Sequence, residues 1–110
     1  MNVESFHSKA REAAALLQSL ANEHRLMILC HLVRRPQSVS ELEATLGLRQ
    51  AALSQNLARL RKDGLVSVRR DGQHSIYAVQ GQAVKAMIST LAHLFCPVAP
   101  IDPGDSSHDH

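Results

Sequence analysis

Residues 38–62 read SVSELEATLGLRQAALSQNLARLRK, a stretch that decides the fold because it encodes two helices separated by a glycine. Ser40 and Glu43 have the spacing of a capping box, in which the two residues satisfy backbone N–H groups at a helix start. Gly47 is placed to end this short helix in the left-handed conformation. The second helix, residues 50–62, has three leucines at helical spacing that we expect to turn inward, Leu53, Leu57 and Leu60. A short helix, a glycine turn and a helix with a polar outer face are typical of a helix-turn-helix.

Beyond these helices the periodicity changes from that of a helix to that of a strand. Residues 65–69 and 75–79 alternate apolar and polar side chains. Asp71-Gly72 between them is a dipeptide typical of hairpin turns. The sequence therefore predicts a β-hairpin directly after the second helix of the pair.

Three more helices are expected from apolar side chains at helical spacing, over residues 5–20, 22–34 and 82–95. Asn22 is expected to cap the second of them, and its inward stripe would be Leu26, Leu29, Cys30, Leu32 and Val33. The last helix is expected to have one apolar face, formed by Val84, Met87, Ile88, Leu91 and Phe95. The predicted fold is mainly α with a β-hairpin wing, a winged helix-turn-helix, over residues 5–96. Residues 97–110, with three prolines and three aspartates, are expected to be a flexible acidic tail.

The composition excludes several classes of protein. With 110 residues, 45% hydrophobic and 20% charged, the chain fits one globular domain and not a disordered or fibrous protein. No apolar stretch reaches the roughly 18 residues of a spanning helix and no signal peptide is recognisable, so we expect a cytoplasmic protein without membrane contact. A core this small is often completed by dimerisation. The sequence lacks a nucleophile–base pair and a phosphate-binding glycine loop, so we expect neither enzyme activity nor a cofactor.

Positive charge is concentrated in one part of the chain. Residues 49–75 hold six basic and two acidic side chains, a net charge of +4, whereas the remainder sums to −2. This distribution suggests a polyanion as partner. On the helix over residues 50–62, polar side chains suit base edges and arginines suit phosphates, whereas a protein-interaction module would leave both unexplained. The residues expected to contact double-stranded DNA are Gln50, Ala51, Ser54, Gln55, Asn56, Arg59, Arg69, Arg70, Gln73 and His74.

Several stretches resemble ArsR/SmtB-type repressors: LANEHRLMIL (residues 20–29), SVSEL (38–42), the helix from Gln50 to Leu60, and KDGLV (62–66). The resemblance covers about residues 10–96. It implies a homodimer whose terminal helices form the interface, with two recognition helices in successive major grooves of a pseudo-palindromic operator. The chain departs from the family pattern at Asn56, where relatives commonly carry His, so its base preference need not follow theirs.

The resemblance also implies an inducer site. Both standard metal sites of the family are absent, because no cysteines cluster around residues 38–42 and the last helix offers only His93. The placement of Cys30 and Cys96 is similar to the dithiol, persulfide-responsive branch of the family (the BigR/SqrR/HlyU type). It implies that reactive sulfur species join Cys30 and Cys96 of one protomer in a di- or polysulfide, which releases operator DNA.

Other roles for the two cysteines stay open. They can form a general thiol switch that answers to peroxide or disulfides. They can also be packing residues, because free cysteine often behaves as a small hydrophobe. The protein would then be a regulator that responds to a metal or to no ligand. A zinc site made from His93 and Cys96 with Cys30 or His31 lacks the usual Cys-x-x-Cys spacing.

Overall fold

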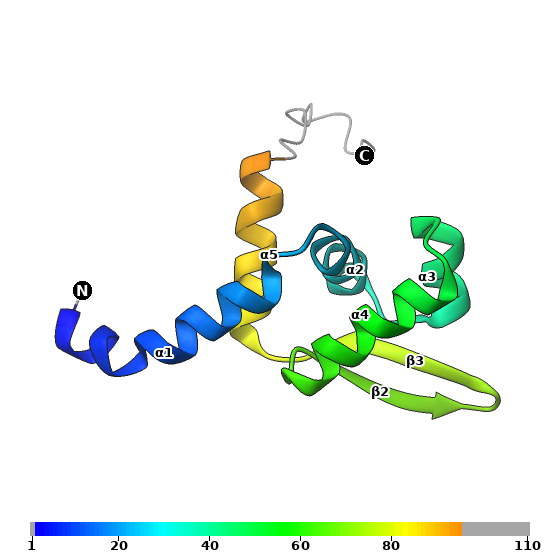
Figure 1. Cartoon of the computed structure of the whole chain (residues 1–110), viewed down its shortest axis with the longest axis horizontal. Helices are drawn as coiled ribbons and strands as arrows, with labels where there is room; N and C mark the ends of the chain where they lie inside the picture. Colours follow the sequence, from blue (N-terminus) through cyan, green and yellow to red (C-terminus); the bar gives the residue numbers. More distant parts are fainter. Residues whose placement is uncertain (1, 96–110) are drawn as a thin grey trace, which may run out of the picture.

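The computed structural model describes residues 2–95, which form five helices and a three-stranded antiparallel sheet (Figure 1). Their order is α1 (Val3–Leu20), α2 (Glu23–Arg34), β1 (Gln37–Ser38), α3 (Val39–Leu46), α4 (Gln50–Lys62), β2 (Val66–Asp71), β3 (His74–Val79) and α5 (Gln82–Phe95). The expected fold is confirmed, with α1 starting two residues earlier than predicted. Cys96 and the acidic segment 97–110 lie outside the described residues. None of the helices within residues 2–95 is long and apolar enough to cross a membrane.

Helix α2 lies at the centre of the molecule. It packs against α1, α3, α4, β3 and α5, while α1 extends away from the body (Figure 1). Because α2 has neighbours on several sides, it buries a wider face than the stripe expected from spacing. Ile28, which that stripe omitted, is fully buried, whereas Leu26, Cys30 and Val33 are only half-buried. Phe95, on the apolar face of α5, lies 77% exposed at the far end of that helix.

The sheet contains a strand that the sequence did not reveal. β1 pairs antiparallel with β3, with Gln37 opposite Tyr77 and Ser38 opposite Ile76, so the strand order is β1-β3-β2. Two residues are too few to show alternation, which explains why spacing did not predict this strand.

The hairpin turn lies one residue later than expected. Asp71 is the last residue of β2 and pairs with His74, which leaves Gly72 and Gln73 as a two-residue loop. Gly72 has φ of 66° and no non-glycine residue among those described has positive φ. Glycine at the first loop position is the requirement of a type II′ turn, whose twist matches the strands.

Helix α3 is capped two residues earlier than predicted. The Ser38 hydroxyl accepts a hydrogen bond from the Glu41 backbone N–H at 3.1 Å, and the Glu41 carboxylate accepts one from the Ser38 N–H at 2.9 Å. The latter bond holds the pKa of Glu41 below its ordinary value. Ser40, the predicted cap, instead lies exposed in the first turn. The pairing of β1 with β3 causes this shift, because it fixes Ser38 in an extended conformation from which the helix can start.

The two serines give a matched test of the cap. Ser38→Ala is expected to lower the free energy of unfolding by about 1 kcal/mol, because a helix cap is lost at a side chain only 7% exposed. Ser40→Ala removes the same hydroxyl from an exposed position and is expected to change the free energy of unfolding by less than about 0.5 kcal/mol. Urea unfolding followed by circular dichroism measures both. Equal losses for the two variants would contradict the cap at Ser38.

Candidate DNA-binding surface and thiol site

Helix α4 presents a polar face away from the core. Its three leucines are buried as predicted, each at most 1% exposed, and they pack among α2, α3 and β2. Gly47 ends α3 in the left-handed conformation, with φ of 68°, so α4 can begin after a short turn. Five residues predicted to contact DNA are exposed on α4: Gln50, Ala51, Ser54, Gln55 and Arg59.

Asn56 differs from the other predicted contacts on this helix. Its side chain is half-buried, and its Nδ2 donates a hydrogen bond at 2.9 Å to the backbone carbonyl of Ala52, one turn earlier. One amide N–H is therefore engaged with its own helix, which leaves the second N–H and the amide oxygen for another partner. A base contact by Asn56 stays a prediction.

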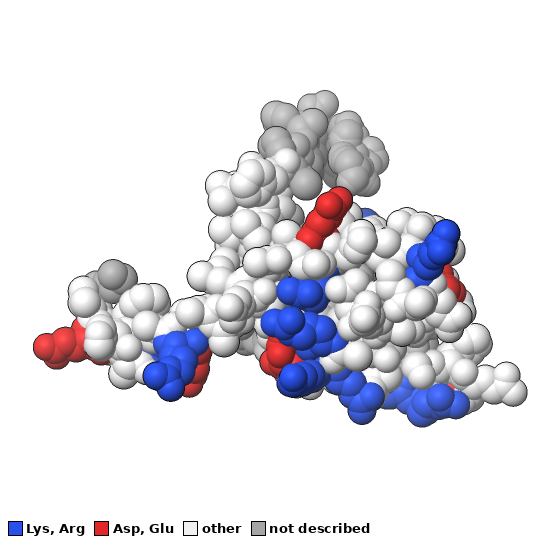
Figure 2. Space-filling view, in the orientation of Figure 1, with Lys and Arg blue, Asp and Glu red and all other residues white. Residues whose placement is uncertain are grey.

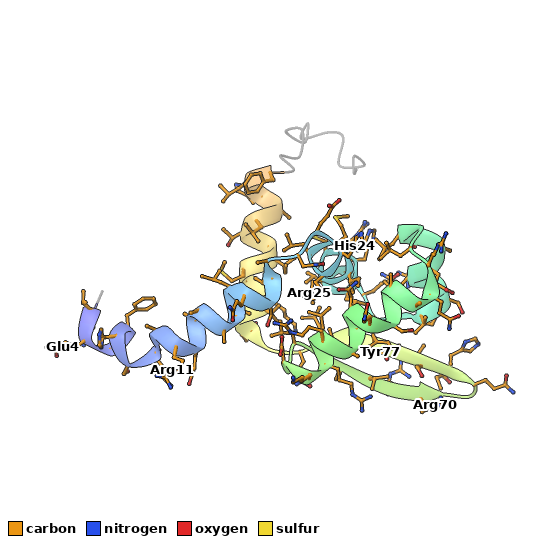
Figure 3. The ribbon with its side chains drawn as sticks, viewed as in Figure 1. Glu4, Arg11, His24, Arg25, Arg70 and Tyr77 are labelled. Atoms are coloured by element: carbon orange, nitrogen blue, oxygen red, sulfur yellow. The ribbon has the colours of Figure 1, made fainter. Side chains whose placement is uncertain are left out.

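The hairpin carries the remaining predicted contacts. Arg69 and Arg70 lie on β2, Gln73 lies in the loop, and His74 begins β3; all four are exposed. Figure 3 shows Arg70 on the hairpin, well away from α1 and α5. The Arg69–Asp71 ion pair is long, at 3.9 Å, and both side chains are more than 60% exposed, so it restrains Arg69 little.

Positive charge gathers on the side of the molecule formed by α4 and the hairpin. Figure 2 shows Lys and Arg side chains in a band along this edge, with few acidic side chains among them. The residues of α4 and β2 that supply this charge are exposed: Arg59, Arg61, Lys62, Arg69 and Arg70. The structure thus brings together the two regions that the sequence predicted to face DNA.

Hydrogen bonds tie the C-terminal end of α4 to α1. The Ser19 hydroxyl donates to Asp63 Oδ2 at 2.5 Å, and Arg59 Nε donates to the same oxygen at 2.8 Å. Both bonds lower the pKa of the Asp63 carboxyl, the one from Ser19 most. Arg25 Nε donates to the Ser19 carbonyl at 2.6 Å, which anchors the other side of Ser19 (Figure 3). No signal in the sequence predicts this network, because Ser19 and Asp63 are 44 positions apart and neither is part of a local motif.

Comparison with known proteins identifies the family. The family described as bacterial regulatory protein, arsR family, matches residues 22–68. The transcriptional activator HlyU of Vibrio cholerae is 46% identical over 96 residues, which cover 87% of this chain and 89% of HlyU. The chain belongs to the ArsR family. The predicted resemblance is therefore confirmed.

Solved structures of ArsR-family regulators agree with the fold. Reduced HlyU from Vibrio cholerae matches with a TM-score of 0.80 and 45% identity, over 84% of this chain and 98% of that one. The transcriptional repressor BigR from Xylella fastidiosa matches with a TM-score of 0.83 and 36% identity, over 87% and 98%. Regulators of this family bind DNA and commonly act as dimers. The present protein is accordingly a DNA-binding transcriptional regulator with a winged-helix fold.

Cys30 lies in this ArsR-family fold at the edge of the core. It is half-buried on α2 and packs against the buried cluster. α2 in turn packs against α5, and the last residue of α5, Phe95, directly precedes Cys96 in the sequence. Because Cys96 lies outside the described residues, the pairing of the two thiols stays a prediction.

The described residues offer no alternative metal centre. Within residues 2–95, the His, Cys, Asp and Glu side chains form no group of three or more that could hold a metal ion. His31 is half-buried on α2 and His93 is exposed near the end of α5. The zinc site considered from the sequence would also need Cys96.

Proposed function

We propose that this protein is a homodimeric transcriptional repressor whose operator affinity falls when reactive sulfur species join Cys30 and Cys96. The observation that carries the DNA-binding part is the exposed polar face of α4 beside the basic hairpin. α4 enters a major groove with Gln50 and Gln55 toward the bases. Arg69 and Arg70 on the hairpin contact the neighbouring backbone or minor groove.

Apolar side chains on the two terminal helices support a dimer. Val3, Phe6, Ala10, Ala13 and Leu17 follow one another on α1 at alternating intervals of three and four residues, the spacing of a helix-pairing seam. Val3, Phe6 and Leu17 are each more than half exposed, as are Leu94 and Phe95 on α5. Isolated large apolar residues are normal on a surface, but a regular row of them is typical of an interface. A second copy of the chain would cover this row and place two α4 helices about 34–36 Å apart.

The sulfur chemistry needs only two thiols and a persulfide. Cys30 attacks the outer sulfur of a persulfide RSSH, which gives Cys30–SSH and RSH. Attack by the Cys96 thiolate on the inner sulfur of Cys30–SSH then forms the Cys30–Cys96 disulfide and releases H₂S. Alternatively, Cys96 first reacts with a second RSSH to give Cys96–S–SR and H₂S. Cys30–SSH then displaces RSH from it and leaves a trisulfide. Two observations support thiol chemistry: Cys30 lies half-buried at the edge of the core, and one relative of known structure is described as reduced HlyU.

A bridge between these cysteines would act on the dimer. α2 packs against α5, so a covalent link from α2 to the residue that follows α5 would restrain the end of a helix that belongs to the proposed interface. A changed position of α5 alters the spacing of the two α4 helices. A coupling of about 1–3 kcal/mol corresponds to a 5- to 150-fold change in affinity.

Glutathione persulfide tests the proposed switch. The reduced protein is titrated onto an operator duplex by fluorescence anisotropy before and after treatment, and intact mass is measured on the same samples. We expect a 5- to 150-fold loss of operator affinity together with loss of two hydrogens or gain of bridging sulfur. Cys30→Ser and Cys96→Ser should each keep full affinity after treatment.

A control with hydrogen peroxide separates the alternatives. Hydrogen peroxide, used in place of persulfide, identifies a general thiol switch if it removes two hydrogens and releases DNA equally well. Unchanged mass and affinity with every reagent would make the cysteines packing residues and contradict the proposed switch, without affecting the DNA-binding assignment.

A further inference from the structure

A polar pocket lies between α4 and the hairpin. It has a volume of about 460 Å³ and is lined by Ser54, Ala58, Arg61 and Lys62 of α4 and by Tyr77 of β3. Ser54, Ala58 and Arg61 are spaced by four and three residues, so they share one face of the helix. Two cationic groups and two hydroxyls therefore meet in one concave site, and no carboxylate is among the residues that line it.

Tyr77 is held in this pocket by the sheet. It lies on the central strand, with Gln37 of β1 on one side and Val68 of β2 on the other. Residues directly opposite in an antiparallel sheet share a face, and Gln37 on this face is buried. The ring of Tyr77 packs against the core cluster and is half-buried. Its position is therefore fixed by backbone pairing on two sides and by packing.

The hydroxyl of Tyr77 has no hydrogen-bond partner among residues 2–95. None of the side-chain hydrogen bonds in that region involves this hydroxyl, and Tyr77 is only half-buried, so the group stays available to a ligand. Tyr77 thus both packs against the core cluster and lines the pocket. An unused donor beside Arg61 and Lys62 matches an anionic ligand, because hydroxyl and guanidinium groups both donate to phosphate oxygens.

We propose that this pocket binds one phosphodiester of the operator backbone, with Tyr77 and Ser54 donating to its oxygens and Arg61 and Lys62 neutralising it. The inference rests on the proposed DNA binding, and it assigns Ser54 to the backbone and not to a base edge. A strand that passes from the major groove occupied by α4 toward the hairpin must cross the space between these two elements. The pocket lies at that crossing, so it sets the register of the protein on the duplex without reading sequence.

Tyr77→Phe removes the hydroxyl and keeps the ring that packs against the core. We expect it to weaken binding to operator and scrambled duplexes alike, by about 10-fold for each half-site, the loss typical of a hydrogen bond to a charged group. Its dependence of affinity on salt should match the unmodified protein, whereas Arg61→Ala should reduce the salt slope by about one per protomer. Ser67→Ala is the matched control, because Ser67 is an exposed hydroxyl opposite Ala78, on the other face of the hairpin.

A methylphosphonate scan of the operator identifies the phosphate. Each backbone phosphate of one half-site is replaced in turn by an uncharged methylphosphonate, and both proteins are titrated onto each duplex. At one position the replacement should lower the affinity of the unmodified protein for the duplex. At that position the unmodified protein and Tyr77→Phe should then bind with equal affinity. Two results would overturn the inference while the proposed function stands. In the first, the losses of affinity from the methylphosphonate and from Tyr77→Phe add at every position. In the second, Tyr77→Phe and the unmodified protein bind the intact operator with equal affinity. Failure of the unmodified protein to bind any duplex would instead overturn the proposed function.

Inorganic phosphate added at constant ionic strength tests a free anion as the ligand. For a DNA phosphodiester, we expect phosphate to lower operator affinity no more in the unmodified protein than in Tyr77→Phe. The opposite result is that phosphate lowers the operator affinity of the unmodified protein alone, while no methylphosphonate position abolishes the effect of Tyr77→Phe. It would assign the pocket to a free anion and overturn the DNA contact. Thermal unfolding of Tyr77→Phe close to that of the unmodified protein confirms that affinity, and not folding, is being compared.

Discussion

A double substitution of Gln50→Ala and Gln55→Ala is expected to remove most of the discrimination between operator and scrambled DNA. Both side chains are exposed on the N-terminal half of α4, the part of a recognition helix that contacts base edges. A bidentate contact from Gln to adenine is worth about 1–3 kcal/mol of discrimination, so the two contacts of each protomer together contribute about 2–6 kcal/mol. Anisotropy titrations on operator and scrambled duplexes at the same salt concentration give the ratio directly.

The contrast with Arg70→Ala makes this test specific. Arg70 is exposed on the hairpin and is proposed to contact the neighbouring backbone or minor groove. If it contacts phosphate, its removal should weaken binding to both duplexes equally and reduce the salt slope by about one per protomer. Equal weakening of both duplexes by the two glutamine substitutions would show that α4 reads no bases through these residues. The docking of α4 proposed above would then be wrong.

The parts of the fold that local chemistry determines were predicted from the sequence. Leu53, Leu57 and Leu60 mark the inward face of α4 by spacing alone, and the structure buries all three. Asn22 caps α2 by accepting a hydrogen bond from the Arg25 N–H, and Gly47 adopts the left-handed conformation at the end of α3. In each case the relevant partners lie within one or two turns of the same segment, so one sequence contains the full signal.

The errors in the fold arise where distant segments decide local structure. The cap of α3 was expected at Ser40, because its spacing to Glu43 is as good as that of Ser38 to Glu41. The choice between the two serines depends on the pairing of Ser38 with Ile76 across the sheet. The pattern of residues within 36–40 does not indicate that pairing. The same limitation explains the missed strand β1 and the incomplete inward stripe of α2.

For the candidate site, exposure was easier to predict than role. The polar residues of α4 and the hairpin are exposed as a surface facing DNA requires, but the structure distinguishes among them. Asn56 donates a hydrogen bond to the backbone of its own helix, and Arg59 donates one to Asp63. Ser54 lines a pocket with Tyr77. Tyr77 carried no functional signal in the sequence, since an aromatic residue in an alternating strand is ordinarily a packing residue.

Disrupting the proposed dimer is expected to have the largest effect on operator binding. Phe6→Asp with Leu17→Asp places two charges on the row of apolar side chains of α1, where both residues are 54% exposed in the single protomer. Neither side chain belongs to the core cluster, so the monomer should keep its fold and its helical circular dichroism spectrum. Sedimentation velocity should show a monomer, and operator affinity should fall by about 10²–10⁴-fold, because two linked half-site contacts become one.

Met27→Asp is the matched control for this double variant. Met27 is an apolar residue 44% exposed on α2, so the substitution adds a charge at comparable exposure without changing a residue of α1 or α5. It should leave the protein dimeric with nearly unchanged operator affinity. If the α1 double variant also stays dimeric and binds the operator normally, α1 lies outside the interface. The three-and-four spacing of its apolar residues would then serve another contact. If it becomes monomeric yet keeps operator affinity, one protomer suffices for binding. A change in the spacing of two α4 helices would then no longer explain how a thiol bridge releases DNA.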